Sequence, residues 1–324
     1  MQTRQPVVDV RNLELHYLTR NGAVRAVDNI SFSLLRGETL GIVGESGCGK
    51  TTMGLGLLNM PTPPGRIVGG QIVIDGTDIV PLSEKDIRAQ IRWKKISMVF
   101  QGAMNCLTPV YTVGKQMRET LQQHKSMPKE EMEKLIAEYI AMVGLPPETV
   151  KRYPHELSGG MKQRVVIAMA LFLQPQVVIL DEPTTALDVI VQAQIINVVK
   201  ELKRKMDLSL IFITHDLATE AEVADRILVM YAGKIAEIAQ NKDIFGATPC
   251  HPYTQRLLAA TPRLHQKVSD LAFIPGKPPD LLDPPAGCRF QSRCAVAFDK
   301  CSEEPPLFEP APGHLAACWR CAHA

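Results

Sequence analysis

A glycine-rich stretch with one lysine and two threonines carries the first chemistry that this sequence could perform. Residues 44–52 read Gly-Glu-Ser-Gly-Cys-Gly-Lys-Thr-Thr and fit the phosphate-binding pattern G-x-x-x-x-G-K-[ST]. In such a loop, backbone N–H groups and the N-terminus of the next helix attract phosphate oxygens. Lys50 would reach the β- and γ-phosphates of a nucleoside triphosphate, and the Thr51 hydroxyl would bind Mg²⁺. The predicted nucleotide-binding residues of the loop are Gly44, Ser46, Gly47, Cys48, Gly49, Lys50, Thr51 and Thr52.

The segments on either side of this loop must position it. An apolar segment, 40–43, predicts a strand that leads into the loop, and residues 52–58 predict a helix that leads out of it. A chance glycine-rich turn before a helix is the alternative interpretation. The strand, lysine and threonine together favour the phosphate-binding loop, because this context supports the motif.

Two adjacent carboxylates form a second candidate site. Residues 177–180 are all apolar, as expected for a fully buried parallel strand, and Asp181 and Glu182 follow them. Asp181 would hold the Mg²⁺ shell beside Thr51, and Glu182 would polarise the water that attacks the γ-phosphate. Acidic pairs after strands are also common on protein surfaces, so this role depends on the phosphate-binding loop.

Gln101 and His215 each follow a further predicted strand, at 96–100 and 209–214. A histidine at such a position could contact the γ-phosphate. Taken alone, however, a histidine or glutamine at the end of a strand is more often a structural residue. Neither residue therefore predicts a function without the other motifs.

The pattern of elements predicts an α/β fold with a mostly parallel core sheet. Strands predicted at 7–17, 26–34 and 70–75 indicate an N-terminal antiparallel β subdomain, and residues 61–70 predict a connection. Residues 102–157 predict a helical insertion, in which apolar residues recur at helical spacing over 128–143. Helices predicted at 161–172 and 189–206 then alternate with strands, and 226–239 predicts a hairpin. We expect one domain over 1–245 and a small proline- and cysteine-rich domain over 246–324.

Composition and charge exclude several classes of protein. The chain has 324 residues, of which 45% are apolar and 22% charged, as in globular proteins with a sizeable core. Its formal net charge of +2 gives no basic footprint of a nucleic-acid binder. The longest apolar run, 165–173, is far shorter than the roughly 18 residues of a membrane span. Because no secretory signal opens the chain, we expect a cytoplasmic protein with reduced thiols.

The cysteines are concentrated near the C-terminus, in a proline-rich segment that is too small to build its own core. Metals or disulfides usually stabilise such segments, and a cytoplasmic location argues against disulfides. Four thiolates fit structural zinc or an iron–sulfur cluster equally well, although the spacing is not that of a zinc ribbon. Cys321 could replace the fourth ligand, and Cys48, Cys106 and Cys250 are expected to be single thiols. The predicted metal ligands are Cys288, Cys294, Cys301 and Cys318.

The order of these motifs resembles that of ABC transporter ATPases. Residues 157–163, Leu-Ser-Gly-Gly-Met-Lys-Gln, resemble the signature sequence of that family and lie between the phosphate loop and the acidic strand. From the residues alone, a capped helix start remains the alternative. The resemblance covers 7 to about 239 and implies two ATPase domains facing head to tail, with each signature closing on the partner's ATP. It assigns Ser158, Gly159 and Gly160 to the ATP site of the partner subunit, and Asp188 to the dimer interface.

The same resemblance assigns roles to three further residues. Tyr17 takes the place of the aromatic residue that stacks on adenine. Gln101 would contact Mg²⁺ and the γ-phosphate and link them to the helical insertion, which contacts the membrane subunits. His215 would be the switch histidine. With Lys50 and Glu182 also present, the chain's own composite site is expected to hydrolyse ATP.

Several segments are similar to the D-type ATPase of dipeptide and oligopeptide importers. These are residues 161–164, 167–171, 181–189 and 191–194, followed by His-Pro-Tyr-Thr at 251–254, Ile-Pro-Gly at 274–276 and the cysteines. The resemblance implies an ATP-hydrolysing motor that pairs with a second, related ATPase subunit. It also implies two transmembrane permease subunits, an extracytoplasmic solute-binding protein reached through them, and a peripheral location on the cytoplasmic face of the cell membrane. It further favours a 4Fe–4S cluster over zinc, with a structural or redox-sensing role.

One departure from that family follows Gln101. The family usually continues there with an acidic residue and proline, whereas residues 102–106 are Gly-Ala-Met-Asn-Cys. Because this loop leads to the membrane subunits, the departure puts partner contacts in doubt rather than hydrolysis. The alternative function is a soluble ABC ATPase in translation or DNA repair. The single ATPase domain and the short helical insertion argue against it.

Overall fold

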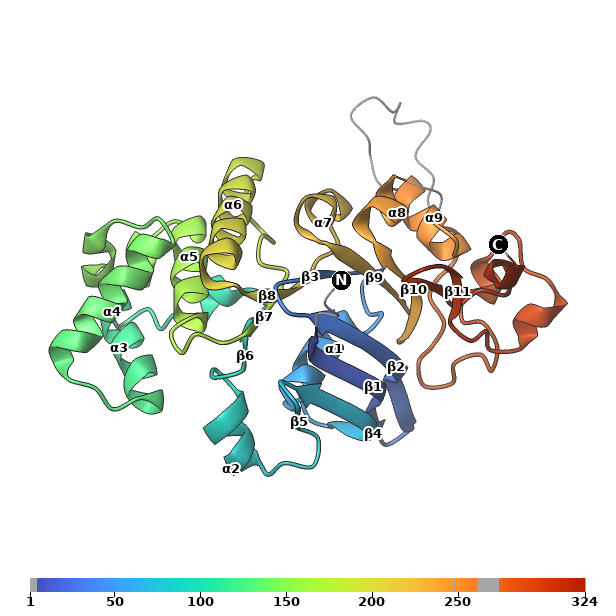
Figure 1. Cartoon of the computed structure of the whole chain (residues 1–324), viewed down its shortest axis with the longest axis horizontal. Coiled ribbons are helices and arrows are strands. Elements are labelled where there is room, and N and C mark those ends of the chain that lie inside the picture. Colours follow the sequence, from blue (N-terminus) through green and yellow to red (C-terminus); the bar gives the residue numbers. More distant parts are fainter. Residues whose placement is uncertain (1–4, 247–248, 261–273, 324) are drawn as a thin grey trace. The chain divides into compact units, whose positions relative to one another are not determined.

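The computed structural model describes residues 5–246, 249–260 and 274–323. The chain forms two compact units (Figure 1). The first contains 35–37 and 83–211, and the second contains 6–34, 38–82 and the described residues from 212 onward. Each unit is described by itself.

The second unit contains a small antiparallel sheet near the N-terminus. Its strands are β1 (Pro6–Thr19), β2 (Gly22–Leu35), β4 (Gly65–Ile74) and β5 (Thr77–Asp78), in the order β2-β1-β4-β5. This confirms the predicted β subdomain. The prediction of a connection up to residue 70 was wrong, because β4 already begins at Gly65, where it pairs with Tyr17 of β1. Pairing with β1 outweighs the weak strand preference of the glycines in this segment.

A second sheet in the same unit carries the phosphate-binding loop. Its strands here follow the order β11-β12-β10-β9-β3, with β3 (Thr39–Val43) parallel to β9 (Arg226–Tyr231). The predicted hairpin is confirmed, since β10 (Lys234–Gln240) pairs antiparallel with β9 around Ala232 and Gly233, both with positive φ. The C-terminal strands β12 (His314–Ala316) and β11 (Phe308–Ala311) extend the edge beyond β10.

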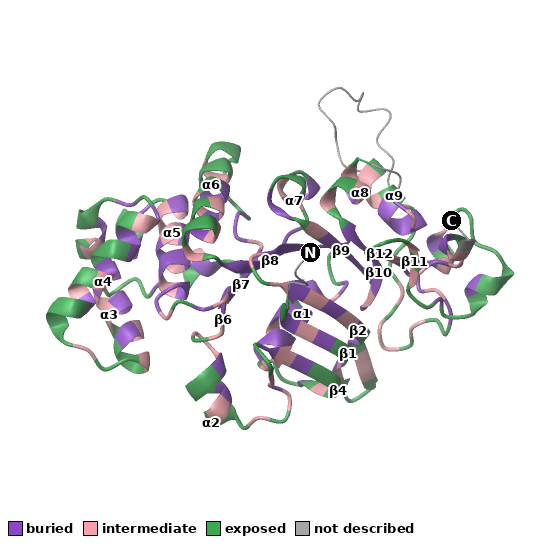
Figure 2. Cartoon of the chain, viewed as in Figure 1, coloured by how far each residue is buried: buried purple, intermediate pink, exposed green. Residues whose placement is uncertain are grey.

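The helices of the second unit are short. They are α1 (Lys50–Leu57), α7 (Leu217–Val223), α8 (Asn241–Phe245) and α9 (Pro252–Ala259). Apolar side chains of β9, β10 and α8 form one core with Tyr253 and Phe290. This core joins the C-terminal segment to the strands that support the phosphate-binding loop. Figure 2 shows that β9 and β10 are largely buried.

The first unit contains the helical insertion and the acidic strand. Strand β6 (Ile96–Val99) runs parallel to β7 (Val177–Asp181), and β8 (Ser209–Ile213) begins in this unit and ends in the other. The helices are α2 (Glu84–Asp86), α3 (Val113–His124), α4 (Lys129–Met142), α5 (Gly159–Ala170) and α6 (Val189–Met206). The predicted helical face of 128–143 is confirmed, because Met132, Ile136, Tyr139 and Ile140 of α4 are buried.

Within the described ranges, every helix is too short or too polar to cross a bilayer.

Candidate nucleotide-binding site

The glycines of the phosphate-binding loop do two different things. Gly44 has φ +154° and Gly49 has φ +106°, and a Cβ atom on either would lie 2.2 Å from a backbone carbonyl oxygen, of Met230 and Ala26 respectively. No larger residue fits there without moving the backbone. Gly47 also has positive φ, +78°, but a Cβ on it would meet no atom within 4 Å. Two glycines are thus required by packing, and the third borders open space.

Lys50 lies at the start of α1 with its ammonium group folded back on the loop. Its side chain is buried, and Nζ donates to the carbonyl oxygens of Gly44 (2.8 Å) and Glu45 (3.0 Å). The Cys48 sulfur lies 3.8 Å from the same nitrogen. Burial raises the pKa of the Cys48 thiol, an effect that Lys50 partly offsets, so this thiol stays protonated at neutral pH.

Tyr17 reaches the same loop from β1. Its hydroxyl lies 3.1 Å from the Thr52 hydroxyl, and its ring is half-buried and packs close to Gly65. Thr51 and Ser46 are exposed beside it. The structure therefore brings the predicted adenine-stacking residue next to the predicted phosphate contacts. His215 belongs to the same unit and is exposed just after β8.

The predicted carboxylates lie in the first unit, at the end of β7. Asp181 is fully buried, and Glu182 follows it with the unusual φ of +47°. Gln101, at the end of the neighbouring parallel strand β6, donates its amide N–H to Glu182 Oε2 at 2.8 Å. The Thr185 hydroxyl donates to the same oxygen at 2.9 Å. The two strand ends thus bring Gln101 and Glu182 together, and Thr185 is a residue that sequence reasoning missed.

The signature residues form the start of a helix, as predicted. Ser158 caps α5, and its hydroxyl accepts the Met161 N–H at 3.3 Å. Gly160 is buried, and a Cβ on it would lie 2.4 Å from Val191 Cγ1 of α6, so close helix packing requires this glycine. Ser158 is exposed and Gly159 is half-buried. Ser158 is therefore the most exposed residue of the signature.

Asp188 caps α6, and its carboxylate accepts the Val191 N–H at 3.0 Å. The next two residues, Val189 and Ile190, are 79% and 72% exposed. Water-exposed aliphatic side chains beside a helix cap are unusual enough to suggest a surface that another molecule covers. The interface role of Asp188 stays a prediction.

The structure corrects the expectation that the cysteines form no disulfide. Cys250 and Cys321 are joined by a disulfide bond, with their Cα atoms 6.0 Å apart. The prediction of Cys250 as a single thiol and of Cys321 as a possible metal ligand was therefore wrong. A separation of 71 residues hid this pair, which meets because β12 pairs with β10 and brings the C-terminus back to the start of α9.

The four predicted metal ligands remain free thiols around one small pocket. Cys288, Cys294, Cys301 and Cys318 all line it. Burial, with smaller effects of the charges of the other three thiols, raises the pKa of the Cys288 thiol to about 11. Across the described residues, no three His, Cys, Asp or Glu side chains are grouped to hold a metal ion. The predicted metal site is therefore not confirmed.

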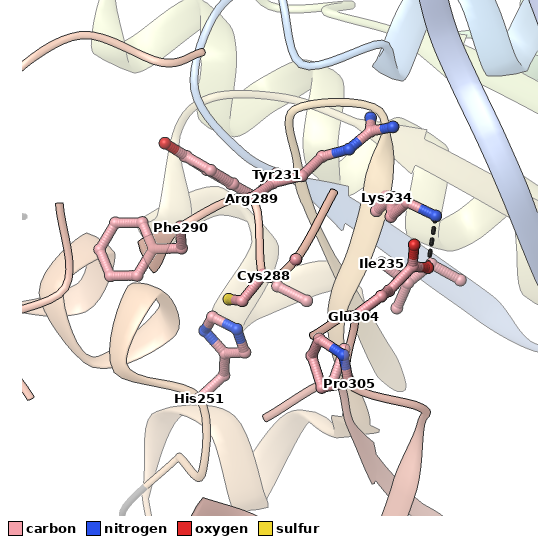
Figure 3. A pocket seen from close by; sticks show the side chains of 12 residues that line it. Tyr231, Lys234, Ile235, His251, Cys288, Arg289, Phe290, Glu304 and Pro305 are labelled. Carbon is pink, nitrogen blue, oxygen red and sulfur yellow. Dashed lines mark hydrogen bonds and ion pairs between the residues drawn. The ribbon is translucent and has the colours of Figure 1, made fainter. Parts of the chain in front are cut away.

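A second pocket adjoins Cys288 (Figure 3). His251 and Phe290 line it on one side, and Lys234 and Glu304 form an ion pair of 2.6 Å at its other side. Burial lowers the pKa of His251 to about 4, so the imidazole is neutral at physiological pH. Its Nδ1 accepts the Tyr253 N–H at 3.0 Å and caps α9.

Comparison with known proteins defines the class first. A family model described as "ABC transporter" matches residues 27–185. The dimeric structure of MJ0796, a bacterial ABC transporter cassette, matches with a TM-score of 0.65 and 27% identity, over 72% of this chain and 98% of that one. The structure of cbiO1 from Clostridium perfringens matches with a TM-score of 0.65 and 27% identity, over 74% of this chain and 91% of that one. The fold is that of an ABC ATPase.

The relatives then define the branch. A model described as "Oligopeptide/dipeptide transporter, C-terminal region" matches 236–301. The dipeptide transport ATP-binding protein DppD of Bacillus subtilis is 46% identical, over 97% of this chain and 95% of that protein. The oligopeptide transport ATP-binding protein OppD of Escherichia coli is 45% identical, over 98% and 94%. The chain belongs to the family of ABC transporter ATP-binding proteins, in the branch that contains DppD and OppD.

Proposed function

We propose that this chain is the ATP-hydrolysing motor subunit of a membrane importer for dipeptides or oligopeptides. The observation that carries the proposal is one continuous similarity to DppD and OppD that includes both the ATPase region and the peptide-transporter C-terminal region. The alternative, a soluble ATPase of translation or DNA repair, gains no support from these relatives.

In the proposed reaction, the phosphate-binding loop would hold the ATP phosphates, and the Thr51 hydroxyl and the Asp181 carboxylate would help to hold Mg²⁺. A Cβ atom on Gly47 would meet no atom within 4 Å, so this side of the loop leaves room for phosphate oxygens. Tyr17 stacks on adenine beside the loop. Glu182 orients the attacking water, and the hydrogen bonds from Gln101 and Thr185 hold its carboxylate in place. His215 contacts the γ-phosphate as the switch residue.

The proposed active form is a head-to-tail dimer with a second ABC ATPase subunit, most simply a related chain. The exposed Ser158 and the exposed Val189 and Ile190 beside Asp188 support this arrangement, because the rest of the described chain leaves these side chains accessible to a partner. Two transmembrane permease subunits would receive the motion through the helical insertion, and an extracytoplasmic solute-binding protein would deliver the peptide. The chain would lie peripherally on the cytoplasmic face of the membrane.

We further propose that Cys288, Cys294, Cys301 and Cys318 hold a 4Fe–4S cluster. The donor set fits this group, since four thiols around one pocket are the ligands that such clusters use. The cluster is preferred to zinc because the cysteine pattern resembles that of peptide importers that carry such a cluster. When bound, the cluster would supply redox chemistry or cross-link this segment.

Replacing Glu182 by Gln tests the motor function. The amide cannot act as a base, but the motifs that bind ATP remain, so we expect ATP binding to persist while turnover falls at least 100-fold and a closed dimer accumulates. Size-exclusion chromatography with ATP, together with phosphate release by the assembled importer, would show both effects. Unchanged turnover would contradict the role of Glu182.

Anaerobic purification tests the cluster. We expect a broad visible absorption band and about four irons per chain, both lost in a Cys288→Ser, Cys301→Ser double variant. Stoichiometric zinc without visible absorption would instead support the zinc alternative.

A further inference from the structure

Glu45, the second residue of the phosphate-binding loop, is held by side chains that belong to none of the ATP motifs. Its backbone N–H donates to the Tyr253 hydroxyl at 2.9 Å. Arg293 binds its carboxylate with two parallel hydrogen bonds, Nη1 to Oε2 at 2.6 Å and Nη2 to Oε1 at 3.0 Å. Lys50 donates to the carbonyl oxygen of Glu45. Hydrogen bonds therefore hold the backbone N–H, the backbone carbonyl and the carboxylate of Glu45.

The guanidinium group of Arg293 is itself firmly placed. Its side chain is only 3% exposed. Besides Glu45, it donates to the carbonyl oxygens of Pro275 (2.8 Å) and Ile274 (3.2 Å) and to the Tyr231 hydroxyl (3.2 Å). A bidentate arginine–carboxylate pair whose guanidinium group is buried and held by other contacts gives strong geometric control, because the arginine loses little further freedom when it binds the carboxylate.

Tyr253 is an equally rigid support. It is fully buried, and its ring packs against those of Tyr231 and Phe290 with centroids 4.5 and 5.3 Å away. Burial raises the pKa of its hydroxyl, so the group stays neutral. The hydroxyl therefore accepts the Glu45 N–H from a fixed position.

We infer that Arg293 and Tyr253 are positioning residues for ATP, which makes the C-terminal segment part of the scaffold of the nucleotide site. They fix Glu45, and Glu45 in turn fixes the start of the turn in which Gly47 faces open space. A loop already held in shape binds phosphate without losing further conformational freedom. This inference rests on the proposed binding of ATP to this loop.

The position of Arg293 in the chain ties this contact to the cysteine segment. Arg293 directly precedes Cys294 and ends a single helical turn whose first residue, Gln291, donates its N–H to the Cys288 carbonyl oxygen. Cys288 in turn donates its own N–H to the Cys301 carbonyl oxygen at 3.0 Å. The fold of the cysteine segment therefore sets where the guanidinium group lies.

Equilibrium titration of the full-length chain with a fluorescent ATP analogue and Mg²⁺ tests this inference. We expect Arg293→Gln and Glu45→Gln each to weaken binding about tenfold, and Tyr253→Phe about threefold. Because the two residues act through one contact, the double variant Glu45→Gln, Arg293→Gln should be no more than about threefold weaker than either single variant. Arg293→Lys should lie in between, since it keeps the charge but loses the bidentate geometry.

Glu304→Gln is the matched control. This substitution removes the ion pair between Glu304 and Lys234 (Figure 3). That ion pair also joins the C-terminal segment to the hairpin, but neither residue belongs to the phosphate-binding loop. We expect the nucleotide affinity of Glu304→Gln to stay within twofold of that of the original chain.

Equal affinity of folded Arg293→Gln or Arg293→Lys and the original chain would overturn the inference, as would additive effects in the double variant. If the original chain itself bound no ATP, the proposed function would fail instead. Should Arg293→Gln not fold, Tyr253→Phe and Arg293→Lys still decide the question.

Discussion

Replacing Gly49 or Gly47 by Ala should separate the packing role of one loop glycine from the binding role of the other. Both residues have positive φ, so alanine costs about 1–2 kcal/mol of unfolding free energy at either position. At Gly49 the new methyl group would also lie 2.2 Å from the Ala26 carbonyl oxygen in β2. Since that oxygen belongs to a strand and cannot swing aside, overpacking adds about 1–3 kcal/mol.

We therefore expect Gly49→Ala to lower the unfolding free energy by about 2–5 kcal/mol, and Gly47→Ala by no more than about 2 kcal/mol. Nucleotide affinity, measured per folded molecule, should instead fall more in Gly47→Ala than in Gly49→Ala. A methyl group on Gly47 occupies the open space that phosphate needs, so affinity should fall at least tenfold, or about 1.4 kcal/mol.

Urea unfolding followed by circular dichroism gives the first comparison, and titration with a fluorescent ATP analogue gives the second. If Gly49→Ala were as stable as Gly47→Ala, the argument from the backbone contact would be wrong. If Gly47→Ala bound nucleotide like the original chain, phosphate would not lie over that residue.

Three further predictions concern buried contacts. Burial of Glu220, with a smaller effect of the nearby Asp216 charge, raises the pKa of its carboxyl group well above the usual value. Because Glu220 of the unfolded chain ionises first, the unfolding free energy should fall as the pH rises above about 4.5. Glu220→Gln should remove this loss, and the gain in melting temperature over the original chain should be larger at pH 8 than at pH 5; a gain independent of pH would refute this. Gly160→Ala should destabilise the chain by about 1–3 kcal/mol, and Val191→Ala should restore most of that loss, because the added methyl meets Val191; the absence of rescue in a double-mutant cycle would count against it. Cys321→Ser should cost about 4 kcal/mol under oxidising conditions, as expected for a cross-link over 71 residues, and nothing after reduction of the original chain; equal melting curves without reductant would contradict the disulfide.

The ATP motifs were accessible from the sequence because each depends on neighbouring residues. The turn at Gly44 to Gly49 requires glycines at fixed spacing, and those φ angles are positive in the structure. Helix α6 begins at Val189 and ends at Met206, the bounds predicted from the sequence. The parallel strands β6 and β7 then bring Gln101 and Glu182 to one edge, which follows from topology alone.

Other features became clear only once the path of the whole chain was known. The sequence places Arg293 in a cysteine-rich tail, 248 residues from Glu45, and nothing local suggests that the two residues meet. Likewise, Cys250 and Cys321 pair only because β12 joins the edge of the sheet next to β10. The first residues of β4 form a strand because β1 pairs with them, although their composition favours a turn.

By itself, the sequence determined which chemistry this protein carries, since the phosphate-binding loop, the acidic strand and the signature depend on spacings of a few residues that local backbone geometry enforces. The tertiary structure alone decided what supports the loop. Tyr253 and Arg293 are buried against strands that are distant in sequence. No short sequence pattern predicts that burial. A tail that is far from the predicted nucleotide-binding loop in the sequence is in contact with that loop in the folded chain.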